Sequence, residues 1–326
     1  MKRREFIALF GGAAAAWPVV ARAQDAGRTY RLGLMFPFPR DARESVGIVD
    51  ALIDELRRNG FVEGQNLAIE YRAWAPHLIS DYAANLAARP LDVSAVGGPV
   101  AVRAVQKATK TMPILAITDD MIGEGVVKSM ARPDGNTTGV SILATELNGK
   151  RQEILIEVVP GARRIAALAD TNATPPGLLE ALQQEAKARS IELAIQRVDN
   201  GNEIPAALGS AKAAGAAALN VLASPMLHAN HQLILQRVAE LRLPAIFQWP
   251  ELAEEGGFVA YGPRFTQLIR DLYARQLVQV FRGVKVAEIP VEQPSKFELA
   301  INLKTANALG ITVPPTMVAR ADKVIE

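Results

Sequence analysis

The chain of 326 residues contains no cysteine, and this absence excludes disulfide bonds, thiolate metal sites and cysteine nucleophiles. An excess of charge of one sign is also missing, since 36 Lys and Arg residues stand against 34 Asp and Glu residues. Proteins that bind nucleic acids carry a basic excess, so we expect no nucleic-acid partner. Aromatic residues make up only 6% of the chain, but 49% of it is hydrophobic, which is enough for the cores of two domains.

Long hydrophobic runs are absent as well. The weakly apolar run over residues 6–21 is broken by glycine and proline, and it is shorter than the ~20 residues that a membrane-spanning helix needs. Arg3-Arg4 precede this run, and residues 21–23 form a small-x-small cleavage site. We therefore predict that residues 1–23 are a twin-arginine export signal. The mature chain would carry 32 basic and 33 acidic residues, and we expect it in the periplasm and not embedded in a membrane.

Short apolar runs alternate with longer amphipathic ones from residue 30 onward. The expected strands are 30–36, 67–74, 91–96, 112–117, 164–169, 192–197, 217–222 and 245–247, and the expected helices are 44–59, 79–88, 100–109, 147–159, 177–189, 203–214, 227–241 and 265–282. Strands that are separated by helices of this length predict parallel sheets with right-handed crossovers. The fold class is therefore α/β, with two Rossmann-like lobes. The glycine-flanked stretch 135–139 is expected to be a turn.

The order of these segments suggests how the chain divides. The first lobe is expected over 28–142, the second over 143–262, and a helical return to the first lobe over 263–290. A final crossing and a C-terminal segment on the second lobe would cover 291–326. Two lobes joined by repeated crossings can open and close on a ligand.

Ligands in open α/β sheets lie beyond the carboxyl ends of the strands, so we searched the loops at those ends. The candidate ligand-binding residues are Phe38, Gly98, Asp120, Asn172, Ser224, Trp249, Glu251 and Tyr261. Asp120 and Glu251 are expected to hold cationic groups of the ligand, and Gly98 and Ser224 its carboxylate or hydroxyl groups. The three aromatic residues would form the walls of the site.

Enzymatic motifs are largely missing. No phosphate-binding loop and no nucleophile with an adjacent base stand out, so we expect no catalytic residues and no cofactor. Asp119, Asp120 and Glu124 leave an exported hydrolase open as an alternative, which would require two carboxyl groups in one cleft within roughly 5–10 Å. His228 and His231 have the spacing of half a metal site. Because no third ligand is near them, we expect a solvated helix start and no metal.

Several segments resemble a known family. Residues 291–306 read VEQPSKFELAINLKTA, 309–315 read LGITVPP, and 320–326 read RADKVIE. These motifs, with GFVEGQNL at 60–67, resemble those of a bacterial family of ABC-transporter substrate-binding proteins. The better understood members of that family are tied to tryptophan and tyrosine.

The resemblance implies a type I periplasmic-binding-protein fold, with two lobes, a three-segment hinge and the ligand in the cleft between them. It also implies that a membrane permease receives the ligand, which would be an amino acid, aromatic or otherwise, or a small organic acid. A monomer is the default expectation. A sensory binding protein that signals to a membrane receptor would have the same fold and stays open as an alternative.

Overall fold

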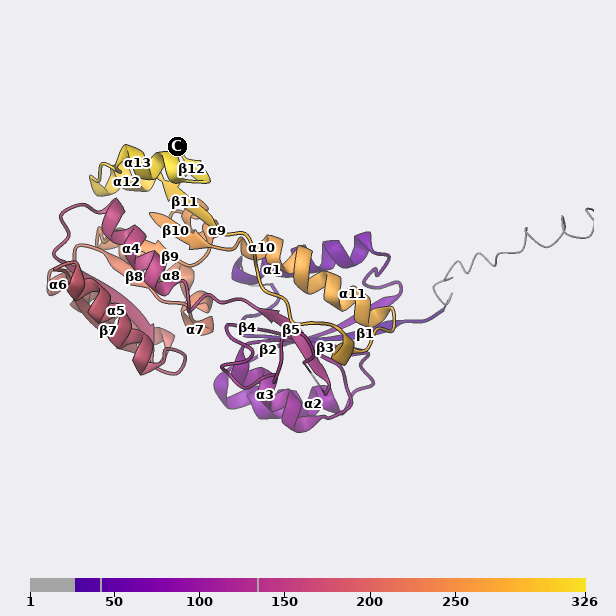
Figure 1. The fold of residues 1–326 in the computed structure, drawn as a ribbon. Helices are drawn as coiled ribbons and strands as arrows, with labels where there is room; N and C mark the ends of the chain where they lie inside the picture. The colour runs from indigo at the N-terminus through magenta and orange to yellow at the C-terminus, as the bar shows by residue number, and fades with distance from the viewer. Residues whose placement is uncertain (1–26, 42, 134) are drawn as a thin grey trace, which may run out of the picture.

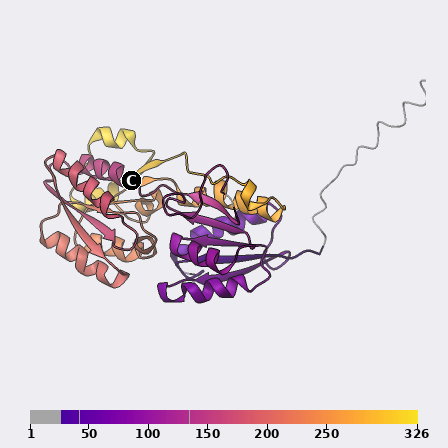
Figure 2. The same ribbon diagram turned by 60° about the horizontal axis from the view of Figure 1, so that its bottom comes forward.

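Two β-sheets organise the residues that the computed structural model describes, which are 27–326 apart from 42 and 134. The predicted export signal at 1–23 lies outside the described residues. Each sheet carries its own helices and forms one lobe, and the two lobes lie side by side (Figure 1). Figure 2 shows from another side that they remain distinct bodies joined by connecting segments.

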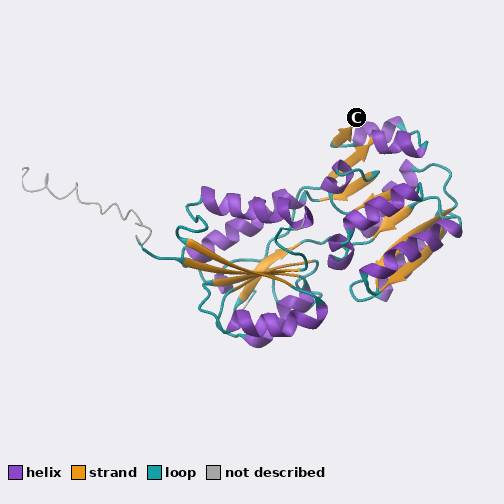
Figure 3. Ribbon diagram, turned by 180° about the vertical axis from the view of Figure 1, so that it is seen from behind, coloured by secondary structure: helices purple, strands orange, loops and turns teal. Residues whose placement is uncertain are grey.

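The first lobe contains a five-stranded parallel sheet of order β2-β1-β3-β4-β5. Its elements are β1 (Tyr30–Phe36), α1 (Arg43–Arg58), β2 (Leu67–Ala73), the 3-10 turn η1 (Pro76–Leu78), α2 (Ile79–Ala87), β3 (Val93–Gly97), α3 (Pro99–Ala108), β4 (Ile114–Thr118) and β5 (Thr137–Ser141). Helices cover both faces of this sheet (Figure 3). The inner strands β1, β3 and β4 are therefore almost entirely buried, which explains their largely apolar sequences, whereas the edge strand β2 is half-buried.

The second lobe contains a seven-stranded sheet of order β12-β11-β10-β9-β8-β6-β7, in which only β10 and β11 pair antiparallel. Its strands are β6 (Arg164–Asp170), β7 (Glu192–Val198), β8 (Leu219–Val221), β9 (Ala245–Phe247), β10 (Val259–Gly262), β11 (Glu298–Asn302) and β12 (Lys323–Ile325). Its helices are α4 (Asn148–Val158), α5 (Pro176–Ala188), the 3-10 turn η2 (Gly201–Glu203), α6 (Ile204–Ala213), α7 (Pro225–Ala229), α8 (His231–Glu240), α9 (Pro250–Glu254), α12 (Leu303–Leu309) and α13 (Pro315–Arg320).

A long helix returns from the second lobe to the first. It consists of α10 (Phe265–Leu268), a π-helical stretch η3 (Ile269–Ala274) and α11 (Arg275–Phe281), followed by the 3-10 turn η4 (Val286–Glu288). Its apolar side packs into the core beneath β1 and α1. The hydroxyl of Tyr273 donates to the carbonyl of Leu115 at 2.7 Å, inside that core. This helix therefore belongs structurally to the first lobe. No helix among the described residues is both long and apolar enough to span a membrane.

The predicted α/β fold is confirmed, and most predicted elements match the structure within two residues. The stretch 135–139 is an exception, because residues 137–141 form β5, which pairs with β4. The turn was predicted from glycines, but Gly139 uses its φ of +149° to pass close to the backbone of Ala116. The predicted helix 227–241 also divides at Asn230, whose side chain donates to the Met226 carbonyl and closes α7.

Three segments connect the lobes: the first crossing (142–147), the second crossing (263–264) and the third crossing (291–297). The fully buried guanidinium of Arg151 joins the first crossing to the end of β10, just before the second crossing, since Nη1 donates to the Ala144 carbonyl and Nε to the Tyr261 carbonyl, both at 2.8 Å. The third crossing is tied to the first-lobe sheet by an isolated parallel bridge between Val140 and Glu292. The hinge is therefore cross-linked by hydrogen bonds at both of its ends.

Candidate functional site

The carboxyl ends of the two sheets face each other across the lobe boundary. The ring of Phe38, which follows β1, lies 6.5 Å from that of His228 on α7 of the second lobe. A Cβ atom built on Gly98, after β3, would lie 4.0 Å from Cγ of Pro225. Loops from the ends of different parallel strands thus come together between the lobes.

Four rings form a cluster at this boundary, and we call Phe38, His228, Trp249 and Phe265 the interlobe aromatic cluster. The centroid of the His228 ring lies 6.1 Å from that of Trp249 and 5.6 Å from that of Phe265. The rings of Trp249 and Phe265 are 4.6 Å apart. Phe38 comes from the first lobe, and Phe265 begins the return helix. The cluster therefore joins both lobes and the hinge.

Polar atoms in this cluster lack partners. Both ring nitrogens of His228 and Nε1 of Trp249 are shielded from solvent, and no described residue forms a hydrogen bond with them. Burial, assisted by the neighbouring His231, lowers the pKa of His228 to about 3, so its imidazole is neutral at physiological pH. A buried polar atom without a partner costs about 1–3 kcal/mol. Such atoms favour a site that a ligand completes.

The expectation of a solvated helix start at His228 and His231 is wrong. The side chain of His231 is 4% exposed, and its Nδ1 donates to the carbonyl of His228 at 2.7 Å. The two imidazoles stack at 5.4 Å. The physical reason is that α7 begins at the lobe boundary, where Ser224 caps it and the ring of Phe38 lies against His228, and that His231 is covered by His228 and Glu255. Sequence spacing alone carries no sign of that covering surface.

Ser224 and Asn172 order the loops of the second lobe. The hydroxyl of Ser224 donates to Oδ2 of Asp170 at 2.6 Å and accepts from the backbone N–H of Leu227. The other oxygen of Asp170 accepts from the backbone N–H of Asn172. The side chain of Asn172 is exposed and donates to the carbonyl of Asp199 at 3.3 Å. Both candidate residues are at strand ends, as expected, and both use their polar groups within the lobe.

Glu251 and Tyr261 lie beside the second crossing. Oε1 of Glu251 accepts from both the backbone N–H and the hydroxyl of Thr266, each at 3.0 Å, whereas its buried Oε2 has no partner among the described residues. The ring of Tyr261 lies 6.4 Å from that of Phe297 on the third crossing. Glu251 is two positions after Trp249 and binds Thr266, which follows Phe265 of the aromatic cluster, and Tyr261 contacts the third crossing.

The acidic residues after β4 mainly order the backbone. Asp119 accepts from the backbone N–H of Thr145 with both oxygens, at 2.9 and 3.1 Å. Oδ1 of Asp120 accepts from the backbone N–H of Ile122, within its own loop. Burial raises the pKa of Glu124 to about 7, and the two aspartates add to that rise. No group of three potential metal ligands occurs in the described part of the chain.

The structure brings together some predicted residues and adds others. The rings of Phe38 and Trp249 both contact the ring of His228, and Gly98 lies close to the segment that begins at Ser224. Sequence analysis did not identify Phe265 or Arg151 as important. No sequence pattern marks these two residues, because their roles depend on contacts with segments that are distant in the chain.

Two α/β lobes whose strand ends face each other across a three-segment hinge define a two-lobed binding protein with the type I periplasmic-binding-protein fold. The chain belongs to the family of ABC transporter substrate-binding proteins, whose family model matches residues 39–325. This family consists of binding proteins, and the chain is therefore a substrate-binding protein and not an enzyme. The hydrolase alternative is set aside for that reason.

Individual relatives agree with this assignment. A tyrosine-binding protein of Clostridioides difficile (strain R20291) is 26% identical over 274 residues, which cover 81% of this chain and 75% of that protein. An ABC domain from Streptococcus pneumoniae in complex with L-Trp superposes with a TM-score of 0.77 at 22% identity, covering 90% of this chain and all of the other. A conserved domain protein from Vibrio cholerae O1 biovar El Tor gives a TM-score of 0.81 at 21% identity, covering 91% of this chain and all of the other.

Proposed function

We propose that this protein is the periplasmic substrate-binding component of an ABC uptake transporter. It captures a small solute between its lobes, closes around it by hinge motion and delivers it to a membrane permease as a monomer. An aromatic amino acid is the first candidate for the solute, followed by other amino acids and small organic acids. The family and the relatives named for tyrosine and L-Trp support this order.

The observation that carries the proposal is the interlobe aromatic cluster with its unpartnered polar atoms. A planar aromatic ligand would pack well among these rings, because offset and edge-to-face ring contacts are favourable. The N–H of Trp249 would donate to the ligand. The neutral imidazole of His228 can donate from one nitrogen and accept at the other. Ligand affinity would come from better contacts in the closed state, which shifts the lobes toward closure.

Among the other candidate residues, Oε2 of Glu251 is available to an ammonium group. Gly98, with a φ of +87°, is the residue that precedes the N-terminus of α3, and this N-terminus is where a carboxylate would approach. Asp120, Asn172, Ser224 and Tyr261 remain candidate ligand contacts in this proposal. In the present arrangement the polar groups of Asp120, Asn172 and Ser224 hold loops in place, so a direct role for these three requires that the loops rearrange when the ligand binds.

The test is a thermal-shift and calorimetric titration with L-tryptophan, L-tyrosine and L-phenylalanine, together with their deaminated acids. A ligand at about 100 times its dissociation constant adds about 2.7 kcal/mol to the stability of the folded state. We expect Trp249→Phe, which keeps the ring and removes the N–H, to weaken binding about tenfold. Tyr273→Phe is the matched control, since it removes one buried polar atom from the first-lobe core.

This control should lower stability and leave ligand affinity unchanged. The assignment of an aromatic solute is wrong if none of the aromatic compounds stabilises the protein. The proposal is wrong in its placement of the site if Trp249→Phe and Tyr273→Phe have equal effects on affinity.

A further inference from the structure

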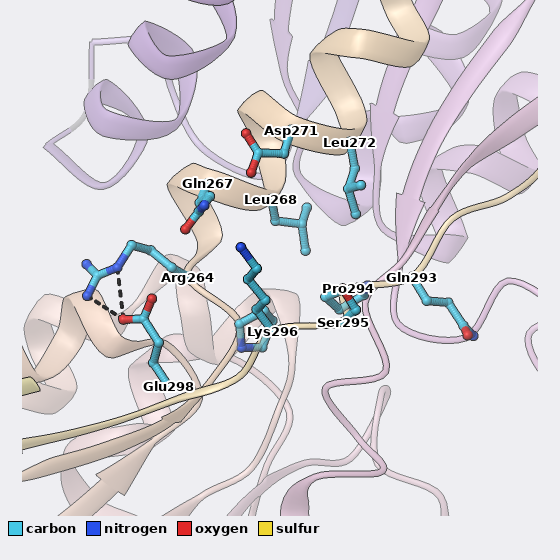
Figure 4. A pocket seen from close by; sticks show the side chains of 11 residues that line it. Arg264, Gln267, Leu268, Asp271, Leu272, Gln293, Pro294, Ser295, Lys296 and Glu298 are labelled. Carbon is cyan, nitrogen blue, oxygen red and sulfur yellow. Dashed lines mark hydrogen bonds and ion pairs between the residues drawn. The ribbon is translucent and has the colours of Figure 1, made fainter. Parts of the chain in front are cut away.

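A second pocket lies on the hinge, and no residue of the interlobe aromatic cluster lines it (Figure 4). Its space of about 500 Å³ includes open solvent, so it is a partly open hollow on the surface of the hinge. One wall is the start of the return helix, from Arg264 to Leu272, and the other is the third crossing over 293–296. The pocket is thus built from segments that connect the two lobes.

Some charged side chains around this pocket form ion pairs and others do not. Arg264 is fully engaged, since its guanidinium lies 2.8 Å from Glu298 and 3.1 Å from Glu254. Lys296 and Asp271, in contrast, form no ion pair with any described residue. Figure 4 shows the Lys296 side chain reaching from the third crossing toward the helix, which carries Asp271. A cation and an anion therefore stand unpaired on facing walls.

Apolar groups complete the lining. Leu268 is buried and Leu272 is half-buried, and both extend from the helix toward the third crossing, where Pro294 faces them. The π-helical stretch Ile269–Ala274 forms this part of the wall. Such stretches are rare and frequently occur at functional sites. The pocket thus combines an apolar lining (Leu268, Leu272 and Pro294) with two side chains of opposite charge (Lys296 and Asp271).

We propose that this hinge pocket is a second ligand site, which binds a zwitterionic amino acid with a small aliphatic side chain. Lys296 would hold the carboxylate, Asp271 would hold the ammonium group, and the side chain would lie on Leu268 and Leu272. This site shares no residue with the interlobe aromatic cluster and is therefore separate from the interlobe site. Because an occupant touches both the return helix and the third crossing, it would favour one angle between the lobes.

The test is a titration of the isotope-labelled protein with L-leucine, followed through its backbone amide signals. Two matched compounds each lack one charge: 4-methylpentanoate has no ammonium group, and 3-methylbutylamine has no carboxylate. We expect saturable shifts at 264–272 and 293–298 with L-leucine and about tenfold weaker binding of either single-charge analogue. Lys296→Ala and Asp271→Asn should each weaken L-leucine binding about tenfold, and Lys296→Arg should retain most of it.

Lys285→Ala is the control, because Lys285 is an exposed lysine that lies before the third crossing and outside the pocket. It should bind L-leucine as the wild type does. Equal binding of the three compounds would overturn the proposal, as would the absence of any shift at the hinge. Shifts confined to Phe38, His228 and Trp249 would also overturn it, and would instead make L-leucine a ligand of the interlobe site.

Discussion

Glu124 shows how the environment of one residue sets its chemistry. It lies in the loop after β4, where burial raises its pKa, Thr118 opposes the rise, and the carboxylates of Asp119 and Asp120 add to it. The resulting pKa is about 7, compared with 4.5 in the unfolded chain. The folded protein therefore binds a proton at this site between these two values, whereas the unfolded chain has already released it.

This difference predicts a pH-dependent stability. As the pH rises through the range from 4.5 to about 7, the unfolded chain releases its proton while the folded state keeps the buried carboxyl group protonated, so the folded state loses stability relative to the unfolded state. Glu124→Gln removes that titration. We expect urea midpoints of the wild type and Glu124→Gln to be similar near about pH 5 and the variant to be the more stable near about pH 8.

Glu146→Gln is the control, since Glu146 is an exposed glutamate of the first crossing. Its midpoints should follow those of the wild type at both pH values. If the wild type and Glu124→Gln change in parallel over the whole range, Glu124 does not titrate in the way proposed.

Among the elements, β5 shows where local sequence misleads. The sequence Gly135-Asn136-Thr137-Thr138-Gly139 has the composition of a turn, but its second half pairs with β4 in the first-lobe sheet. A Cβ atom at position 139 would lie 1.8 Å from the carbonyl oxygen of Ala116. Glycine is needed here because the neighbouring strand is so close, which is a tertiary requirement and not a turn signal.

Gly139→Ala should therefore be strongly destabilising. The added methyl group requires that β5 move away from β4, and the φ of +149° is unfavourable for alanine. We expect a loss of about 3 kcal/mol or more in the free energy of unfolding, measured by urea denaturation.

Gly177→Ala provides the comparison within a helix. Its Cβ would meet no atom within 4 Å, so this substitution in α5 should raise stability by about 0.4–1 kcal/mol. Comparable losses in both variants would mean that the close approach at Gly139 is not what matters.

At the scale of the whole molecule, one ring contact across the lobe boundary links the first lobe to the second. Phe38 belongs to the first-lobe core, where it stacks on Phe36 at 5.8 Å, and its edge meets His228 of the second lobe. A contact between rings contributes about 0.5–1.5 kcal/mol. That amount is sufficient to change the balance between open and closed arrangements by roughly two- to tenfold.

Phe38→Leu should shift the balance toward the open arrangement, because it keeps an apolar side chain in the core and removes the ring. Small-angle X-ray scattering should then show a larger radius of gyration for the ligand-free variant. Phe61→Leu removes a ring that contacts Tyr30 and Phe281 inside the first lobe. It should lower stability to a similar degree and leave the radius of gyration unchanged; equal radii for both variants would contradict a role of Phe38 in closure.

Much of the fold was determined by the sequence by itself. Parallel strands that are buried on both faces have apolar sequences, and helices on a sheet repeat apolar residues with their own period, as Ile48, Leu52 and Leu56 do in α1. The strand at 30–36 was predicted to the residue for this reason. The family motif over 291–306 can likewise be identified without a structure, because its residues are contiguous in the sequence.

Tertiary structure alone decided which of these residues meet. Arg151 reaches the Tyr261 carbonyl across 110 positions of the chain, and Tyr273 reaches that of Leu115 across 158. The ring nitrogens of His228 are shielded from solvent, and the rings of Phe38 and Phe265, which come from other segments, lie against the imidazole. Hydrogen bonds and ring contacts depend on proximity in space, whereas sequence patterns report only neighbours along the chain. The strand ends of the site were therefore predictable, but its partners and the hinge pocket were not.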